Sequence, residues 1–215
     1  MNKNVDYTLY LCTDRKLMTS ETIELSVKEA IEGGCTVIQL REKDTTSLEF
    51  YNIAKSIKKI TDNYSVPLII NDRLDIAIAV DAAGVHLGQK DLPAQIVRKI
   101  VGENKIIGVS TATVEEAINA QEDGADYIGV GAVFSTGTKL NTRKVTFEML
   151  SEISKSVNIP TVAIGGINLN NIDLLQGSGI SGVAVVSAVI AQKDVKNSAA
   201  ELYKKVINIK KQYLK

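Results

Sequence analysis

The sequence is poor in the residues that build zinc sites and disulfide frameworks. Its 215 residues include two cysteines, Cys12 and Cys35, and a single histidine, His86. A structural zinc site needs a close cluster of Cys and His ligands, and a disulfide scaffold needs more cysteines than these, so we expect neither. Two isolated cysteines are typical of a protein from a reducing compartment, and we therefore expect a cytoplasmic protein.

The sequence also has no excess of positive or negative charge and no long apolar runs. Lys+Arg and Asp+Glu amount to 25 each, which gives a formal net charge of +0. A nucleic-acid-binding domain would carry a basic stripe, so we expect no nucleic-acid partner, and any anion site must be local. The first residues lack the pattern of a signal peptide, and no apolar stretch is long enough to cross a bilayer, so we expect no membrane contact.

What the sequence does contain is a regular alternation of short apolar segments and amphipathic helical patterns. The segments expected to form strands are 8–12, 37–43, 67–71, 84–87, 106–110, 127–130, 161–164 and 182–186. Eight strand–helix units without a linker predict one domain over residues 1–215, a (β/α)8 TIM barrel of the α/β class. A doubly wound open sheet is the alternative, because a count of short apolar runs can be wrong by one or two elements.

The second apolar segment ends in charged residues. Because strand side chains alternate, Gln39, Arg41 and Lys43 are expected on one face and Leu40 on the other. An amide followed by a guanidinium and an ammonium group predicts a phosphate site. The alternative is a solvated strand end, with both cations paired to the neighbouring acidic residues.

Acidic residues follow the third and fourth strands. Asp72 comes after Asn71, and Asp91 lies in the loop that follows His86. Active sites of barrels are built where strands pass into the following loops, so the two carboxylates can converge. Mg²⁺ typically takes one or two carboxylates and substrate phosphates, which favours a magnesium site over the alternative that each Asp caps a helix.

The later strand ends carry hydroxyl groups and glycines. Ser110 ends the fifth strand, and the segment 135–139 holds hydroxyls, a glycine and a lysine that suit a phosphate. Gly165-Gly166 and Ser187 follow the last two strands, where barrels frequently bind phosphate. The alternatives are that Ser110 caps a turn, that the segment 135–139 is an ordinary polar loop, and that Gly165-Gly166 are plain turn glycines. His86, on a buried strand, is expected to be a core residue rather than a catalyst.

Taken together, these motifs resemble those of the thiamine-phosphate synthase family over nearly the whole chain and in the right order. The matching motifs are Gln39-x-Arg41-Glu42-Lys43, Asn71-Asp72, His86-Leu87-Gly88-Gln89-x-Asp91, Gly108-Val109-Ser110, Thr136-x-Thr138-Lys139, Ala163-Ile164-Gly165-Gly166-Ile167 and Val186-Ser187. The resemblance implies a transferase of thiamine biosynthesis. It would join a hydroxymethylpyrimidine diphosphate to a thiazole phosphate, releasing pyrophosphate, by a dissociative and magnesium-assisted mechanism.

The resemblance also implies residue roles. The pyrimidine diphosphate would be bound by Gln39, Leu40, Arg41, Glu42, Lys43, Asn71, Ser110 and Lys139. Arg41, Lys43, Ser110 and Lys139 would also be catalytic. The thiazole phosphate would be bound by Thr136, Gly137, Thr138, Gly166, Val186 and Ser187. Asp72 and Asp91 would bind Mg²⁺ as the cofactor.

One departure from the family pattern is visible. Many relatives have a histidine two residues after the serine of the fifth strand, where this chain has Ala112. A sister family of thiazole tautomerases would be expected to place its base in that loop, and a non-catalytic phosphate-binding regulator is the other alternative on this fold. The partners expected are small phosphorylated molecules. The sequence leaves open a homo-oligomer and whether the thiazole carries a carboxylate.

Overall fold

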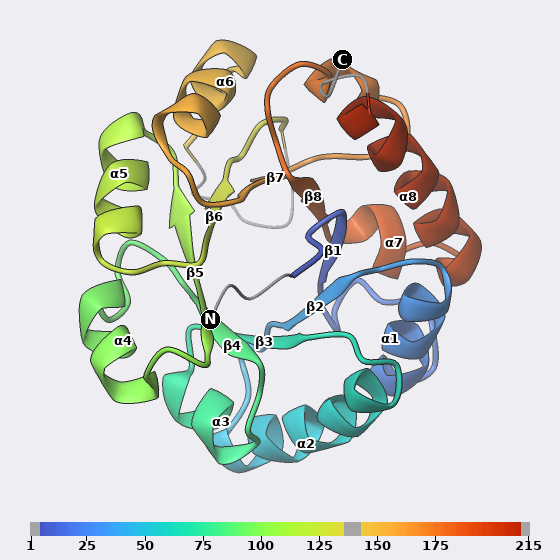
Figure 1. Ribbon diagram of the computed structural model, residues 1–215. Helices are drawn as coiled ribbons and strands as arrows, with labels where there is room; N and C mark the ends of the chain where they lie inside the picture. The colour runs from blue at the N-terminus through green and yellow to red at the C-terminus, as the bar shows by residue number, and fades with distance from the viewer. Residues whose placement is uncertain (1–4, 136–142, 212–215) are drawn as a thin grey trace.

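A computed structural model describes residues 5–135 and 143–211. Eight parallel strands form a closed barrel in which each strand pairs with the next along the chain and the last pairs with the first (Figure 1). The strands are β1 (Leu9–Cys12), β2 (Val37–Leu40), β3 (Leu68–Asn71), β4 (Gly84–Leu87), β5 (Ile106–Thr111), β6 (Tyr127–Val130), β7 (Thr161–Ile164) and β8 (Gly182–Val185). The predicted barrel is confirmed, and the closing pair of β1 and β8 excludes the open sheet.

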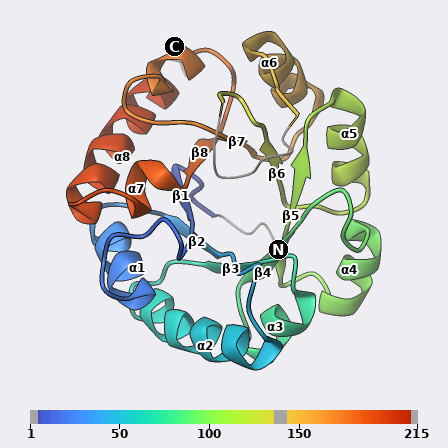
Figure 2. The same cartoon turned by 180° about the vertical axis from the view of Figure 1, so that it is seen from behind.

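Helices surround the barrel on its outside, as Figures 1 and 2 show from opposite sides. They are α1 (Ile23–Glu32), α2 (Ser47–Asn63), α3 (Leu74–Ala79), α4 (Ala94–Val101), α5 (Val114–Glu122), α6 (Phe147–Ser156), α7 (Ser187–Ile190) and α8 (Val195–Lys211). A 3₁₀ helix, η1 (Ile172–Leu175), lies between β7 and β8. None of the helices in these described ranges is long and apolar enough to span a membrane.

Two apolar layers result from the alternation of strand side chains. The outer layer contains Ile38 and Leu40 and packs the strands against the helices. The inner layer fills the barrel and contains Tyr10, Ile69 and Tyr127. Because parallel strands are covered on both faces, their side chains are buried almost without exception, and polar groups must find partners inside the barrel.

Threonine side chains start four of the helices. Thr22, Thr46, Thr113 and Thr146 each accept a hydrogen bond from the backbone N–H three residues further on. Thr46 and Thr113 are thus the N-caps of α2 and α5. Each cap of this kind typically stabilises a helix by about 1 kcal/mol.

One predicted helix is wrong. The pattern over residues 168–177 predicts a helix, but the structure has only the four-residue η1. Asn168 and Asn171 explain the difference, because both side chains donate hydrogen bonds to the backbone oxygen of Gly166. Asparagine side chains that bond to nearby backbone compete with helix formation.

Candidate functional site

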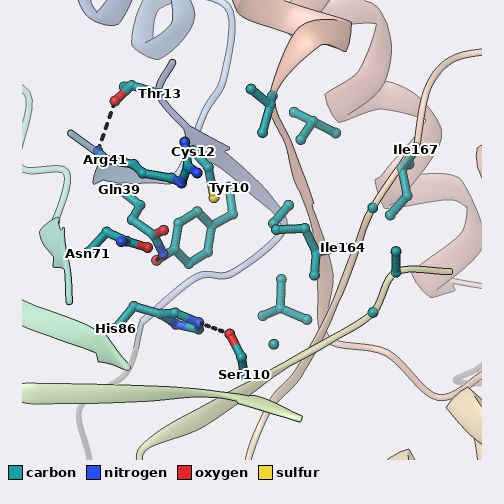
Figure 3. Close-up of a pocket in the computed structure, with 18 of the residues that line it drawn as sticks. Tyr10, Cys12, Thr13, Gln39, Arg41, Asn71, His86, Ser110, Ile164 and Ile167 are labelled. Carbon is teal, nitrogen blue, oxygen red and sulfur yellow. Dashed lines mark hydrogen bonds between the residues drawn. The ribbon is translucent and has the colours of Figure 1, made fainter. Parts of the chain in front are cut away.

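A cavity of about 180 Å³ opens where the strands pass into the following loops. Most of its lining comes from the ends of the strands or from the next few residues, as expected for a barrel site. The lining includes Tyr10, Thr13, Gln39, Arg41, Asn71, His86, Ser110, Tyr127, Ile164, Gly165, Gly166, Val186 and Ser187. Figure 3 shows the polar residues along one side and Ile164 and Ile167 along the other.

The cationic side of the cavity is built from β2 and the loop that follows it. Gln39 is 5% exposed and lines the cavity together with Arg41. The backbone N–H of Arg41 donates to the hydroxyl of Thr13 at 3.1 Å (Figure 3). The Arg41 guanidinium lies 3.5 Å from the carboxylate of Asp14. Arg41 is therefore held at its backbone by Thr13 and at its guanidinium by Asp14, while it lines the cavity.

A row of ion pairs joins the loops after β1 and β2. Next to Arg41 and Asp14, Arg15 bonds to Glu42 at 2.8 Å, and Lys16 pairs with Asp44. The expected alternative, in which Arg41 and Lys43 pair with these two acidic residues, is therefore wrong. Each acidic residue has its own partner from the β1 loop, and Lys43 pairs with Asp72 instead.

Two residues of the proposed pyrimidine diphosphate site have side chains that turn away from the cavity. Leu40 is fully buried in the outer apolar layer. The side chain of Glu42 is 5% exposed and bonds to Arg15. Contacts from either residue to a ligand would have to come from the backbone.

Asp72 and Asp91 do not cap helices. The residues at the starts of α3 and α4 are Arg73 and Pro93, and neither helix has a side-chain cap. Instead, Asp91 accepts the backbone N–H of Gly88 at 2.6 Å. Burial raises the pKa of the Asp91 carboxyl, and the charge of the neighbouring Asp72 raises it further. The two carboxylates thus converge at the mouth of the barrel.

The donor set at this point fits magnesium. In the part of the chain that the structure describes, no three His, Cys, Asp or Glu side chains gather into a cage that could hold a metal. Mg²⁺ does not need one, because it is usually bound by one or two carboxylates, water and substrate phosphates. Asp72 takes a left-handed backbone conformation with φ 61°, which Asp tolerates better than most residues.

The glycine-rich side of the cavity lies opposite. Gly165 and Gly166 have φ values of 104° and 67°, and a Cβ on Gly166 would lie 2.4 Å from the backbone oxygen of Ser135. The N–H of Phe134 donates to the oxygen of Gly165 at 3.0 Å, so the start of the β6 loop rests directly on these glycines. Val186 and Ser187 line the same side of the cavity.

Four of the expected site residues belong to the β6 loop beyond this point. They are Thr136, Gly137, Thr138 and Lys139, and they lie outside the described residues. The described ends of the loop are held together, because the N–H of Ala132 donates to the oxygen of Arg143 and the N–H of Val145 donates back to Ala132, each at 2.9 Å.

Ala112, at the one position where the sequence departs from the expected motif, has a structural role here. Ala112 is buried, and its N–H donates to the Glu116 carboxylate at 2.8 Å. The Glu116 carboxylate also accepts hydrogen bonds from Nη1 and Nη2 of Arg143, each at 2.7 Å. The loop after β5 is therefore tied to the end of the β6 loop.

Several residues of the cavity floor were not expected to belong to the site. Tyr10 and Tyr127 lie in apolar strands and appear in sequence as ordinary core residues. His86 is 9% exposed and has hydrogen-bonded neighbours, as a core residue would, but it also lines the cavity. Strand alternation is the signal that could have found Tyr10, because it places Tyr10 on the same face of β1 as Cys12, which also lines the cavity.

Comparison with known proteins places these observations in a family context. A family model described as thiamine monophosphate synthase matches residues 9–189. The thiamine-phosphate synthase of Ruminiclostridium cellulolyticum is 57% identical over 208 residues, covering 97% of this chain and 99% of that protein. That of Clostridium beijerinckii is 55% identical, covering 97% and 100%. The solved thiamine phosphate pyrophosphorylase from Pyrococcus furiosus superposes with a TM-score of 0.88 at 42% identity, covering 95% of this chain and 97% of that one.

Proposed function

This chain belongs to the thiamine monophosphate synthase family, and from that premise we propose how its cavity carries out the reaction. Its activity is that of a thiamine-phosphate synthase, a transferase that joins a hydroxymethylpyrimidine diphosphate to a thiazole phosphate and releases pyrophosphate. The alternatives, a thiazole tautomerase and a non-catalytic regulator, find no support among these relatives.

The observation that carries the proposal for the diphosphate is the grouping of charges at the ends of β2, β3 and β4. Arg41 and Lys43 would hold the diphosphate, and Asp72 and Asp91 would hold Mg²⁺ beside it. Lys43 already contacts Asp72, so cation and carboxylate meet at one point. When bound, Mg²⁺ supplies charge neutralisation for the pyrophosphate leaving group.

The pyrimidine ring would lie deeper in the cavity, with its diphosphate towards the mouth. Gln39, Asn71 and Ser110 line this part and offer hydrogen bonds to a heterocycle or to diphosphate oxygens. Lys139 would join them from the β6 loop. Leu40 and Glu42 would contribute backbone contacts, because their side chains point elsewhere.

The thiazole phosphate would bind on the opposite side. Gly166, Val186 and Ser187 line it, and Thr136, Gly137 and Thr138 would complete it from the β6 loop. Glycines let backbone N–H groups approach a phosphate closely, and no fixed cation is needed for a monoester held in this way.

The reaction we propose is dissociative. Pyrophosphate leaves first, the pyrimidine methylene becomes a stabilised cation, and the thiazole nitrogen captures it. Each protein cation about 4 Å from the departing charge contributes on the order of 4 kcal/mol at an effective dielectric constant near 20, before desolvation costs. The apolar wall around Ile164 would exclude water, which would otherwise capture the cation.

We propose the remaining properties from sequence. The protein would act on small phosphorylated substrates in the cytoplasm as one catalytic domain over residues 1–215, without a nucleic-acid or membrane partner. The balanced charge and the two isolated cysteines support this proposal.

The test of function is direct. The protein is mixed with the pyrimidine diphosphate, the thiazole phosphate and Mg²⁺, and thiamine phosphate is measured by its fluorescent oxidised form. We expect turnover that a chelator abolishes. Absence of product with active substrates would refute the proposed activity of this chain.

Asp72→Asn tests the metal site in the same assay. We expect the rate to fall at least about tenfold, the loss typical even of residues that only support a metal ligand. Asp75→Asn is the matched control, since Asp75 lies three residues further on and pairs with Arg73 at the surface. An unchanged rate in Asp72→Asn would remove Asp72 from the site.

A further inference from the structure

A chain of four hydrogen bonds runs beneath the cavity from Gln39 to Ser110. The Gln39 side-chain nitrogen donates to the Tyr10 hydroxyl at 2.8 Å, and the hydroxyls of Tyr10 and Tyr127 lie 2.7 Å apart. The Tyr127 hydroxyl lies 2.8 Å from Nδ1 of His86, whose Nε2 lies 2.9 Å from Oγ of Ser110. Figure 3 shows the last of these contacts, with the imidazole directed at Ser110.

The two tyrosines in the middle of the chain are neutral. Tyr10 and Tyr127 are each 1% exposed, and burial raises the pKa of both phenols well above the ordinary value of 10.0. Each phenol therefore brings one proton to the chain and can donate only one hydrogen bond.

The Gln39 end sets the direction of donation. An amide nitrogen can only donate, so the Tyr10 oxygen accepts there and its own proton is left for Tyr127. The Tyr127 proton then goes to Nδ1 of His86. If the hydrogen bonds ran the other way, Tyr127 would donate to Tyr10. The buried Tyr10 hydroxyl would then lose Tyr127 as the acceptor of its proton, and folded proteins avoid buried donors without an acceptor.

The backbone is shaped around two members of this chain. A Cβ on Gly108 of β5 would lie 2.3 Å from the Tyr127 hydroxyl oxygen, and a Cβ on Gly129 of β6 would lie 3.2 Å from Cε1 of His86. Glycine at these two strand positions therefore leaves the space that the phenol and the imidazole occupy. These backbone distances are independent of the hydrogen-bond lengths. They indicate that the barrel accommodates the side chains of Tyr127 and His86 in these positions.

We propose that Tyr127 is a positioning residue that acts through His86 on Ser110. By donating to Nδ1, Tyr127 holds His86 as the tautomer that carries its proton on Nε2, and Nε2–H donates to Ser110. The Ser110 oxygen is then an acceptor inside the chain, and its own proton points into the cavity. Resting on the proposed function, this assigns Ser110 as a hydrogen-bond donor to an oxygen of the diphosphate substrate, not as a base.

A double-mutant cycle tests whether Tyr127 acts through Ser110. With both substrates and Mg²⁺ saturating, we expect Tyr127→Phe to lower kcat about fivefold to tenfold, as for one lost oriented hydrogen bond. In a Ser110→Ala background, the same change should alter kcat less than twofold. An equal loss in both backgrounds would show that Tyr127 acts independently of Ser110 and would overturn the proposal.

Tyr7→Phe is the matched control. The Tyr7 ring packs against that of Tyr127 with centroids 4.8 Å apart, so this variant makes the same chemical change in the same aromatic group but outside the chain. We expect its kcat to stay within twofold of the unaltered protein. A loss as large as that of Tyr127→Phe would mean that the aromatic packing, not the hydrogen-bond chain, is responsible.

The tautomer can be read directly, because His86 is the single histidine of the sequence. In ¹⁵N-labelled, ligand-free protein, we expect nitrogen NMR to show a protonated Nε2 and an unprotonated Nδ1. A proton on Nδ1 would reverse the chain and overturn the proposal, whatever the activity and even if Tyr127→Phe does not fold. Absence of turnover in the unaltered protein would instead refute the proposed function and with it the donor role of Ser110, while the tautomer would still decide the direction of the chain.

Discussion

Gly166 combines a left-handed backbone conformation with a place in the lining of the proposed thiazole phosphate site. It has φ 67°, and a Cβ there would lie 2.4 Å from the oxygen of Ser135. Gly166→Ala therefore adds both backbone strain and a collision with the β6 loop. We expect a loss of about 2 kcal/mol or more in the free energy of unfolding, and a KM for the thiazole phosphate raised at least fivefold. Urea unfolding and steady-state kinetics measure the two effects.

Gly177 provides the control for this change. It has a similar φ of 81°, but a Cβ there would meet nothing within 4 Å. Gly177→Ala should cost only the strain, about 1 kcal/mol, and leave the KM unchanged. If both variants were equally stable and equally active, the close approach to Ser135 would have no consequence.

Sequence patterns predicted the polar side chains at strand ends better than those inside the barrel. Gln39 and Arg41 were singled out because they share one face at the end of the second strand, and Ser110 because it ends the fifth. All three line the cavity. Tyr10 and Tyr127 were not, because parallel strands are apolar on both faces and the inward positions do not stand out. Their hydroxyls acquire a role only through partners that lie far away in the sequence.

At the scale of elements, the loops are held by ion pairs that the sequence could not assign. Asp14 pairs with Arg41, Arg15 pairs with Glu42, and Lys16 pairs with Asp44. The residues of each pair are about 27 positions apart, so their meeting depends on the register of β1 against β2. The sequence spacing instead suggested that Arg41 and Lys43 pair with the acidic residues of their own loop. In the structure, their partners are Asp14 and Asp72.

The pair that joins α5 to the β6 loop should make stability depend on pH. Two hydrogen bonds from Arg143 lower the pKa of Glu116 below its ordinary value of 4.5, although burial opposes the shift. A lowered folded-state pKa contributes stability above the ordinary pKa, and this is lost as pH falls through the lowered value. Arg143→Met should therefore reduce the free energy of unfolding at pH 7 by about 0.5–1 kcal/mol.

Urea unfolding at several pH values checks this expectation. The difference between Arg143→Met and the unaltered protein should shrink below pH 4.5 and vanish in stronger acid, where Glu116 is protonated in both. Lys144→Met, a change at the exposed neighbouring residue, should have little effect at any pH. A difference that stayed constant down to strong acid would show that Arg143 stabilises by packing rather than by its charge.

At the scale of the whole molecule, the barrel was predictable because it repeats. Eight apolar segments separated by helical patterns leave few topologies, and parallel pairing of successive strands brings every strand end to one side. Because all strand ends lie on one side, the sequence alone predicted that the carboxylates of Asp72 and Asp91 can lie near each other. The expected helix over 168–177 failed because it depended on the propensity of one segment rather than on the repeat.

A site assembled from several strand ends links ligand binding to the stability of the entire barrel. Mg²⁺ and pyrophosphate together should bind the folded chain only, and at about 100 times the Kd they would stabilise it by about 2.7 kcal/mol. For a chain of this size, that raises Tm by about 5 to 10 °C in a thermal unfolding experiment. Asp91→Asn should lose most of the increase, and a chelator should abolish it. Asp62→Asn, which removes a carboxylate of a surface pair on α2, should keep it. If pyrophosphate raised Tm equally with and without Mg²⁺, and equally in Asp91→Asn, the anion would be held by Arg41 and Lys43 alone, and the two carboxylates would not form a metal site.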